Sequence, residues 1–260
     1  MCTVLLAYRR VADWPLLVAN NRDEFYSRRA LPPRIYRSSA AGGVRYWLAS
    51  RDLAGGGSWW GWNEAGLTVW LTNRWTATED SSSECRSRGQ LVLDLLQSCD
   101  PDAARARLLE TCSRYRFNPF NLLVVSSQKA FQASNFPELQ LCWLAPGFHF
   151  LGNGLLQECP SLKARSARRL FSGLEAAGIP AGDPGRKLVI SCFLRALATP
   201  LPQDAIPPQG FNVRFPDYGT SASLYLAVPD NSSRPPVFSY CAGNPLYKPY
   251  RDYGKLLNLF

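Results

Sequence analysis

MCTVLLAY at residues 1–8 and VANNRDEF at residues 18–25 are the two stretches from which the fold is predicted. Residues 3–8 and 15–20 are short runs rich in Val, Leu and Ala, and the polar segment RRVADW separates them. Such runs joined by a tight connection are typical of two neighbouring strands. Cys2 is therefore expected at the first position of one strand, and the polar NNRDE at the end of the next.

The rest of the chain alternates between predicted strands and predicted helices. Strands are expected at residues 46–50, 58–63, 67–73, 121–126, 139–144 and 148–151 and in the segments SLYLAVP and VFSY, and helices at 89–98, 101–112, 161–174 and 187–198. A proline-rich surface loop is expected at 200–210, and the glycine triplet 55–57 should let the main chain pass close to another segment. This order predicts a single α+β domain over residues 1–260, with helices on the outer faces of a sheet pair.

Composition and charge exclude several classes of protein. The 46% hydrophobic fraction of the 260 residues is enough for a sizeable core. The net charge is +9, but the basic residues are spread along the chain, so no nucleic-acid partner is expected, while attraction to anionic ligands or lipid head groups stays open. No apolar run reaches the roughly 18 to 20 residues of a membrane-spanning helix, and no signal peptide is recognised. A cytoplasmic location is expected, with an organelle association left open.

The eight cysteines show no C-x-x-C spacing, and there is a single histidine, His149. This pattern indicates neither a zinc site nor a disulfide scaffold, so neither a metal nor a required cofactor is predicted. Reduced thiols in a cytosol-like compartment fit best, and most of these side chains are expected to be small core residues.

Cys2 is the exception, because removal of Met1 would leave a thiol and a free α-amine on one terminal residue. An α-amine titrates at about 7.8 and a free thiol at about 8.5, so the amine can take the proton of the thiol close to neutral pH. An N-terminal amine that activates its own nucleophile is an established form of covalent catalysis. The alternative is an ordinary buried cysteine of a strand.

Neighbouring polar residues support the catalytic alternative. Adjacent residues of a strand point to opposite faces, so Arg22 and Asp23 need not pair with each other, and one of them is expected to face the Cys2 end. A carboxylate there would hold the amine and orient the nucleophile. Asn73 ends a predicted strand, where its amide either donates to a developing oxyanion or caps a turn.

These motifs resemble those of the NRDE family, which is named after the tetrapeptide and includes the transport-and-Golgi-organisation proteins. MCTVLLAY with ANNRDEF is similar to the start of that family, and GGGSWWGWNEAGLTVWLTN, NPFNLLVV and FLGNGLLQECPSLK are similar to its later blocks. Through this family the chain also resembles the N-terminal-cysteine hydrolases of the bile-salt hydrolase and penicillin V acylase group. The resemblance implies the αββα sandwich of N-terminal-nucleophile hydrolases.

The same resemblance implies roles for individual residues. Cys2 would be the nucleophile and its amine the base, Asp23 the orienting carboxylate, Asn73 an oxyanion donor and Asn153 the second active-site asparagine. The chain departs from those relatives in two places. Asn20 and Ser221 stand where arginines are expected. Arg22 is also a candidate catalytic residue, but on a regular strand it is expected to point elsewhere than the arginine of the resembled hydrolases.

Two functions follow from this resemblance, and a scaffold role without small-molecule chemistry stays open beside them. The first is hydrolysis of an amide or thioester bond of an acyl substrate, with Trp59, Trp60, Trp62 and Trp70 either lining an acyl pocket or packing between strands. The alternative is binding and trafficking of an amphipathic anion such as haem, acyl-CoA or a lipid. His149 or Cys2 would then be the candidate haem ligand, although a lone histidine in an apolar strand is more often a satisfied structural residue.

Overall fold

The computed structural model describes residues 2–38, 44–76, 84–154, 161–200, 211–230 and 234–259. The chain divides into two compact units, which are called the first unit (Met1–Ser27 with Ala145–Leu259) and the second unit (Arg28–Leu144). Most of the predicted proline-rich loop lies outside the described residues. That residues 1–260 fold as one domain stays a prediction.

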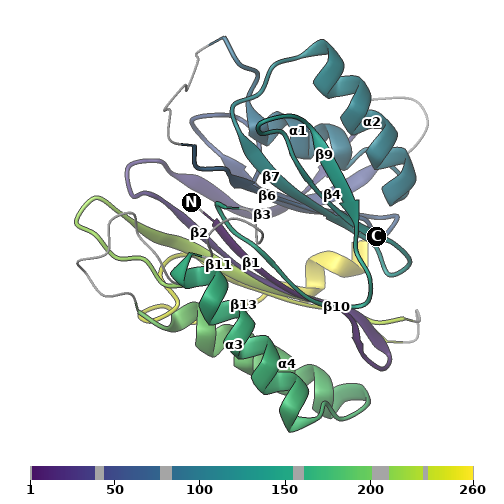
Figure 1. Cartoon of the computed structure of the whole chain (residues 1–260), viewed down its shortest axis with the longest axis vertical. Coiled ribbons are helices and arrows are strands. Elements are labelled where there is room, and N and C mark those ends of the chain that lie inside the picture. Colours follow the sequence, from purple (N-terminus) through teal and green to yellow (C-terminus); the bar gives the residue numbers. More distant parts are fainter. Residues whose placement is uncertain are drawn as a thin grey trace. The chain divides into compact units, whose positions relative to one another are not determined.

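The first unit is built on a six-stranded sheet in which every neighbouring pair is antiparallel. Its strands, in spatial order, are β10 (Gly147–Leu151), β1 (Cys2–Val11), β2 (Trp14–Phe25), β11 (Tyr218–Val228), β12 (Val237–Cys241) and β13 (Arg251–Asp252). Helices α3 (Leu162–Ala177) and α4 (Gly182–Ala198) run along one face of this sheet (Figure 1), and a short 3-10 helix, η1, covers Gly254–Leu259.

The hairpin of β1 and β2 confirms the strand pair predicted from the first residues, but both strands are longer than expected. Most of the RRVADW segment extends the strands, and only Ala12 and Asp13 form the turn. Asp13 takes a positive φ of 67°, a conformation that Asp tolerates better than most residues. Because Val11 pairs with Trp14, the two strands are joined by a two-residue hairpin turn.

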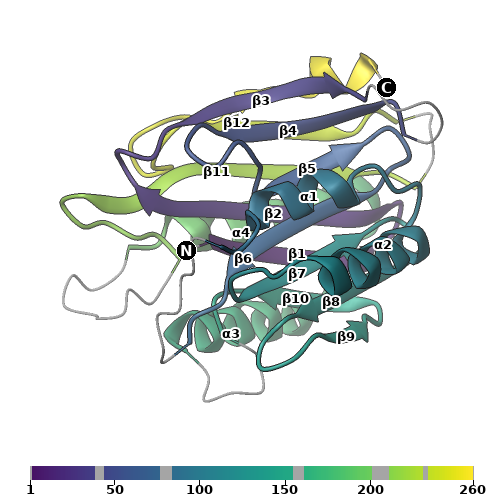
Figure 2. The same cartoon turned by 90° about the horizontal axis from the view of Figure 1, so that it is seen from above.

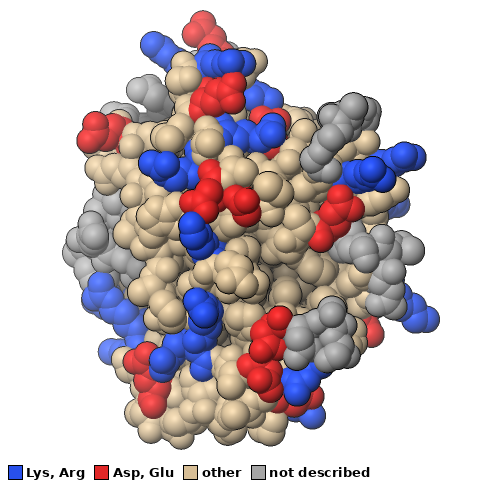
Figure 3. Space-filling model, turned by 90° about the vertical axis from the view of Figure 1, so that its right-hand side faces the viewer, with Lys and Arg blue, Asp and Glu red and all other residues tan. Residues whose placement is uncertain are grey.

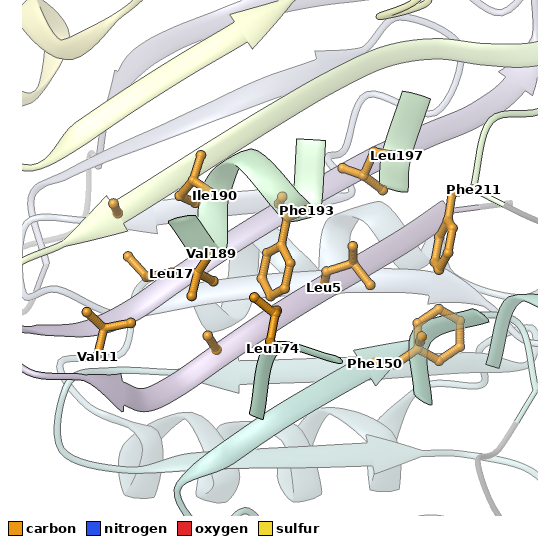
Figure 4. Packing of buried hydrophobic residues seen from close by; sticks show 14 of the residues in the cluster. Leu5, Val11, Leu17, Phe150, Leu174, Val189, Ile190, Phe193, Leu197 and Phe211 are labelled. Carbon is orange, nitrogen blue, oxygen red and sulfur yellow. The ribbon is translucent and has the colours of Figure 1, made fainter. Parts of the chain in front are cut away.

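The core of the first unit lies between this sheet and its helices. Leu5 and Leu17 project from β1 and β2 toward Val189 and Phe193 of α4 (Figure 4). Phe193 is fully buried, and its ring contacts that of Phe148 in a T-shaped arrangement. The alternation of a strand assigns Thr3, Leu5 and other odd positions of β1 to the helix-covered face.

The second unit contains a seven-stranded antiparallel sheet. Its strands, in spatial order, are β3 (Ala30–Arg37), β4 (Tyr46–Asp52), β5 (Trp60–Asn63), β6 (Thr68–Asn73), β7 (Phe120–Val125), β8 (Ala130–Ser134) and β9 (Gln140–Trp143). Helices α1 (Arg88–Leu95) and α2 (Pro101–Arg114) pack on β5, β6 and β7 (Figure 2). Val69 and Leu71 of β6 join the side chains of these helices in one buried cluster.

Two strands of the second unit were not predicted. β3 contains Pro32 and Pro33, which disfavour a strand because proline cannot donate to the ladder. The strand forms because it lies at the edge of the sheet, where a register irregularity between Leu31 and Arg34 accommodates both prolines. β8 is only five residues long and has no β-branched residue, so its sequence carries little strand signal.

The predicted close approach at the glycine triplet occurs at Gly57. A Cβ atom on Gly57 would overlap the main chain of Gly89 at the start of α1, and Ser58 N donates to Gly89 O at 3.1 Å. We expect Gly57→Ala to lower the free energy of unfolding by about 1–3 kcal/mol, because the overlap involves main-chain atoms. Gly173→Ala is the matched control, since nothing lies near a Cβ there in the helix, and it should stabilise by about 0.5–1 kcal/mol. Urea unfolding of both variants measures the contrast, and equal effects would contradict it.

Pro101 takes the first helical position of α2, and Asp100 is its N-cap residue. Its side chain accepts a hydrogen bond from Ala103 N at 2.8 Å, and this bond lowers the pKa of Asp100 from its ordinary value of 3.8. We expect Asp100→Ala to cost about 1 kcal/mol of unfolding free energy at pH 7. Because the carboxylate is favoured in the folded state, the difference from wild type should be full above about pH 4 and shrink as the pH falls further. Asp100→Ser keeps a non-titrating cap, so its stability relative to Asp100→Ala should not fade in acid.

Candidate functional site

Cys2 lies directly opposite Arg22 in the antiparallel pair of β1 and β2. The register pairs Cys2 with Arg22, Thr3 with Asn21 and Val4 with Asn20. Residues directly opposite in such a pair share a face of the sheet, so Arg22 lies on the face of Cys2. The expectation that Arg22 points elsewhere was wrong, because the register of the two strands, which local sequence does not fix, decides its neighbour.

The NRDE tetrapeptide is divided between the two faces of the sheet. Asn21 Nδ2 donates to Leu197 O at 2.9 Å and to Phe211 O at 2.6 Å, so Asn21 secures the end of α4. On the opposite face, Arg22 Nη2 lies 3.9 Å from Glu24 Oε2. The strand alternation therefore gives Asn21 and Asp23 to the helix side and Arg22 and Glu24 to the side of Cys2.

Asp23 is buried among donors from two elements, β11 and α3. Thr220 Oγ1 donates to Asp23 Oδ1 at 2.7 Å, and Lys163 Nζ lies 3.0 Å from Asp23 Oδ2. The main-chain oxygen of Asp23 accepts from Tyr218 Oη at 2.9 Å. Burial chiefly, and the Asp23 charge in addition, raise the pKa of Tyr218, so this phenol stays protonated and remains a donor. The carboxylate is thus rigidly placed next to the residue that faces Cys2.

Ser221, which stands where the resembled family has an arginine, occupies a bulge in β11. The register shifts between Thr220 and Ala222, and Ser221 is the extra residue. Arg22 Nη1 donates to Ser221 Oγ at 3.0 Å, and Ser221 Oγ in turn donates to Arg22 O at 3.2 Å. The bulge therefore aims a hydroxyl at the guanidinium group of Arg22.

The Cys2 thiol is buried, with 8% of the residue exposed. Burial chiefly raises its pKa, and the negative charge of Asp23 raises it further, whereas the positive charges of the amino terminus and of Arg22 lower it. At neutral pH the thiol is accordingly protonated. Any attack by this sulfur requires a base that removes the proton, rather than a thiolate formed in advance.

The two candidate asparagines are placed at strand ends. Val4 pairs with Leu151 in the β1–β10 ladder, so Asn153, two residues beyond, follows β10 at the same end of the sheet as Cys2. Asn73 is the last residue of β6, as predicted, where it pairs with Phe120. Cys2, Arg22, Asp23 and Asn153 thus belong to the first unit, and Asn73 belongs to the second.

The tryptophans of the second unit pack between strands. Trp60 and Trp70 are fully buried and stack with ring centroids 5.6 Å apart. The indole N–H of Trp60 donates to Ser50 Oγ, and that of Trp70 donates to Thr68 Oγ1, each at 3.1 Å. Of the two alternatives for this pair, an acyl pocket or strand packing, the contacts support packing. Trp59 and Trp62 are also buried.

His149 lies in β10, with its ring held by the main chain. Its Nε2 atom is 2.9 Å from Ala145 O, and burial lowers the pKa of the imidazole. A carbonyl oxygen can only accept, so Nε2 carries the proton in this contact. The contact favours the interpretation of His149 as a satisfied strand residue, and a role as haem ligand stays a prediction.

Lys163 is a second polar residue of this region that sequence reasoning misplaces. The basic residues of this helix predict that Lys163 faces solvent with Arg165, Arg168 and Arg169, which are indeed exposed, but Lys163 is 4% exposed. Lys163 precedes the buried Ala167 by four residues, so it lies on the core-facing stripe of α3. That spacing was the available signal, and the helix directs its ammonium group toward Asp23.

On the face drawn in Figure 3, basic and acidic side chains are interspersed rather than separated, so the charge on this face indicates no ligand class. Among the helices of the described ranges, none is long and apolar enough to cross a membrane.

Comparison with known proteins identifies relatives along most of the chain. Residues 1–231 match the family described as Transport and Golgi organisation 2. A Transport and Golgi organization protein 2 homolog of Bos taurus is 31% identical over 238 residues, covering 82% of this chain and 82% of the relative.

Solved structures with a similar fold include an amidase and an acylase. An N-acylethanolamine-hydrolyzing acid amidase ortholog from Caenorhabditis elegans matches with a TM-score of 0.53 at 14% identity, covering 89% of this chain and 96% of that chain. Penicillin V acylase from Agrobacterium tumefaciens matches with a TM-score of 0.53 at 11% identity, covering 96% and 97%. These matches confirm the predicted α+β fold of the N-terminal-nucleophile hydrolase type.

Proposed function

The chain belongs to the Transport and Golgi organisation 2 family, and from this premise we propose that it is a cysteine hydrolase that cleaves an amide or thioester bond of an acyl substrate. The observation that carries the proposal is the pairing of Cys2 with Arg22 at the end of β1 and β2, beside the buried carboxylate of Asp23. The fold shared with solved amidases and acylases supports it.

The first step of the proposed reaction is transfer of the acyl group to Cys2. Once Met1 has been removed, the α-amine of Cys2 takes the thiol proton, and the sulfur attacks the acyl carbon. The carbonyl oxygen becomes an oxyanion, for which the amide of Asn153, at the Cys2 end of the same sheet, is the candidate donor. The role of Asn73, in the second unit, stays a prediction. The resulting ammonium group returns the proton to the leaving amine or thiol as the amide or thioester bond breaks. An acyl-cysteine thioester remains.

Water completes the cycle. The α-amine, neutral again, takes a proton from a water molecule that attacks the thioester carbon. The bond between carbon and sulfur breaks, the free acid leaves, and the proton restores the Cys2 thiol. In both steps the base is the same amine. The first step needs a base because burial raises the pKa of the thiol.

Arg22 is proposed to stabilise the negative charge that develops on the sulfur. Its guanidinium group belongs to the residue paired with Cys2 and is held by Ser221 and Glu24. A fixed cation beside a thiol favours the thiolate form. Asn20 and Ser221 carry no charge where arginines are expected. Arg22, on the same strand as Asn20, thus supplies the positive charge that they lack.

Binding and transport of haem or of an acyl lipid is the second candidate, favoured by the burial of Cys2. Incubating the purified chain with a panel of acyl amides and acyl thioesters separates the two functions. Release of free amine or thiol, together with a Cys2 acyl adduct, is the expected result. Saturable uptake of haem or acyl-CoA without release of product, persisting in Cys2→Ala, would instead establish binding and overturn the proposed hydrolysis.

A further inference from the structure

Lys163 of α3 is a buried cation that the proposed reaction does not use. We propose that Lys163 is a positioning residue for Cys2: its ammonium group fastens the end of β1 to β2 and offsets the negative charge of Asp23. The inference rests on the proposed function only in taking Cys2 as the reactive residue. Its consequence is that Lys163 sets the pH range in which the thiol reacts.

The fastening follows from two contacts of one ammonium group. Lys163 Nζ donates to Thr3 Oγ1 at 2.9 Å and to Asp23 Oδ2 at 3.0 Å. Thr3 follows Cys2 along β1, and Asp23 follows Arg22, the partner of Cys2, along β2. Lys163 therefore ties together the residues that adjoin both members of the Cys2–Arg22 pair.

A hydrogen-bond donor at each of its two oxygens fixes the orientation of the Asp23 carboxylate. Val213 N donates to Thr220 Oγ1 at 3.0 Å, so the single hydroxyl proton of Thr220 is committed to Asp23 Oδ1 at 2.7 Å. Lys163 occupies the other oxygen, and the two side chains of this ion pair are 5% and 0% exposed. A buried carboxylate that loses its cation keeps its charge at a high cost, and that charge then acts on its neighbours unopposed.

Cys2 is one of those neighbours. The charged and titratable groups around it are the amino terminus, Arg22, Asp23 and Glu24 of β2, Tyr218 of β11 and the Lys163 ammonium group behind Asp23. The Asp23 charge disfavours a thiolate at Cys2, and Arg22 favours it. With Lys163 in place, a positive charge lies 3.0 Å from the carboxylate and reduces its effect on the sulfur.

The test is the pH dependence of Cys2 alkylation by iodoacetamide, read by mass spectrometry of the N-terminal peptide. In Lys163→Met the midpoint should rise by about one pH unit, because an uncompensated carboxylate shifts a neighbouring group by about that amount or more. Lys163→Arg should keep the wild-type midpoint, and Lys163→Met/Asp23→Asn should return toward it. The exposed Cys142, measured in the same samples, should show one unchanged profile.

If Lys163→Met does not fold, Asp23→Asn alone still provides the test. It keeps the shape of the carboxylate without its charge, and it should move the midpoint of Cys2 alkylation to lower pH. An unchanged midpoint in Lys163→Met, or a double variant shifted as far as the single one, would overturn the positioning role. The readout is thiol reactivity, so a chain that hydrolyses no acyl substrate would refute the proposed function and leave this result standing.

Discussion

Cys2→Ala is expected to abolish hydrolysis of any acyl amide or thioester that the wild-type chain cleaves, with a loss of about 10³-fold or more in kcat. The side chain supplies the atom that forms the acyl intermediate, so nothing else in the unit replaces it. Loss of activity should come with loss of the acyl adduct, whereas the free energy of unfolding should change by less than about 1 kcal/mol, because the substitution removes one sulfur atom at a strand end. Steady-state kinetics, intact mass and denaturant unfolding measure the three quantities.

Cys112→Ala is the matched control for that loss. Cys112 lies in α2 of the second unit, and burial raises its pKa to about 11, so its thiol is inert near neutral pH. This variant should keep the activity of the wild type. Activity that survives Cys2→Ala, or that disappears equally in Cys112→Ala, would show that Cys2 is not the nucleophile.

Asp23→Ala is expected to be the most destabilising single change in the site, at about 3–5 kcal/mol of unfolding free energy. The substitution removes the carboxylate and leaves the Lys163 ammonium group buried without its ion-pair partner. It also leaves the Thr220 hydroxyl without its acceptor. Denaturant unfolding at pH 7 measures the loss.

Adding Lys163→Met to Asp23→Ala should restore part of the lost stability, since the double variant buries no uncompensated charge. Glu110→Ala is the surface control. Glu110 pairs with Arg114 at 2.8 Å, with both side chains more than half exposed, and its loss should cost less than about 1 kcal/mol. A double variant less stable than Asp23→Ala alone would contradict the account of this pair.

The strand pair that carries Cys2 could be predicted from the sequence because its signal is local. Apolar runs separated by a short polar segment predict a hairpin, and β1 and β2 follow that pattern. Strand β6, which ends at Asn73, could be predicted in the same way. Gly66, with φ of 82°, lies in the turn before this strand, and glycine is a local signal for such a turn. These features depend on residues only a few positions apart.

The neighbours of Cys2 could not be predicted in the same way, because they depend on contacts between distant segments. A shift of one residue in the register would have brought Asp23 rather than Arg22 opposite Cys2. Lys163 reaches Asp23 across 140 positions of the chain. Its burial contradicts the usual exposure of lysine, and only the carboxylate that it meets in the folded unit makes that burial tolerable.

Mass spectrometry of the N-terminal peptide, from chain purified after expression in cells and trapped with an acyl substrate, tests the central claim most directly. We predict a peptide that begins at Cys2, without Met1, and that carries the acyl group on this residue. A peptide that retains Met1 would contradict the account, because the α-amine would then belong to a different residue from the thiol. An acyl group found on any other residue would contradict it equally.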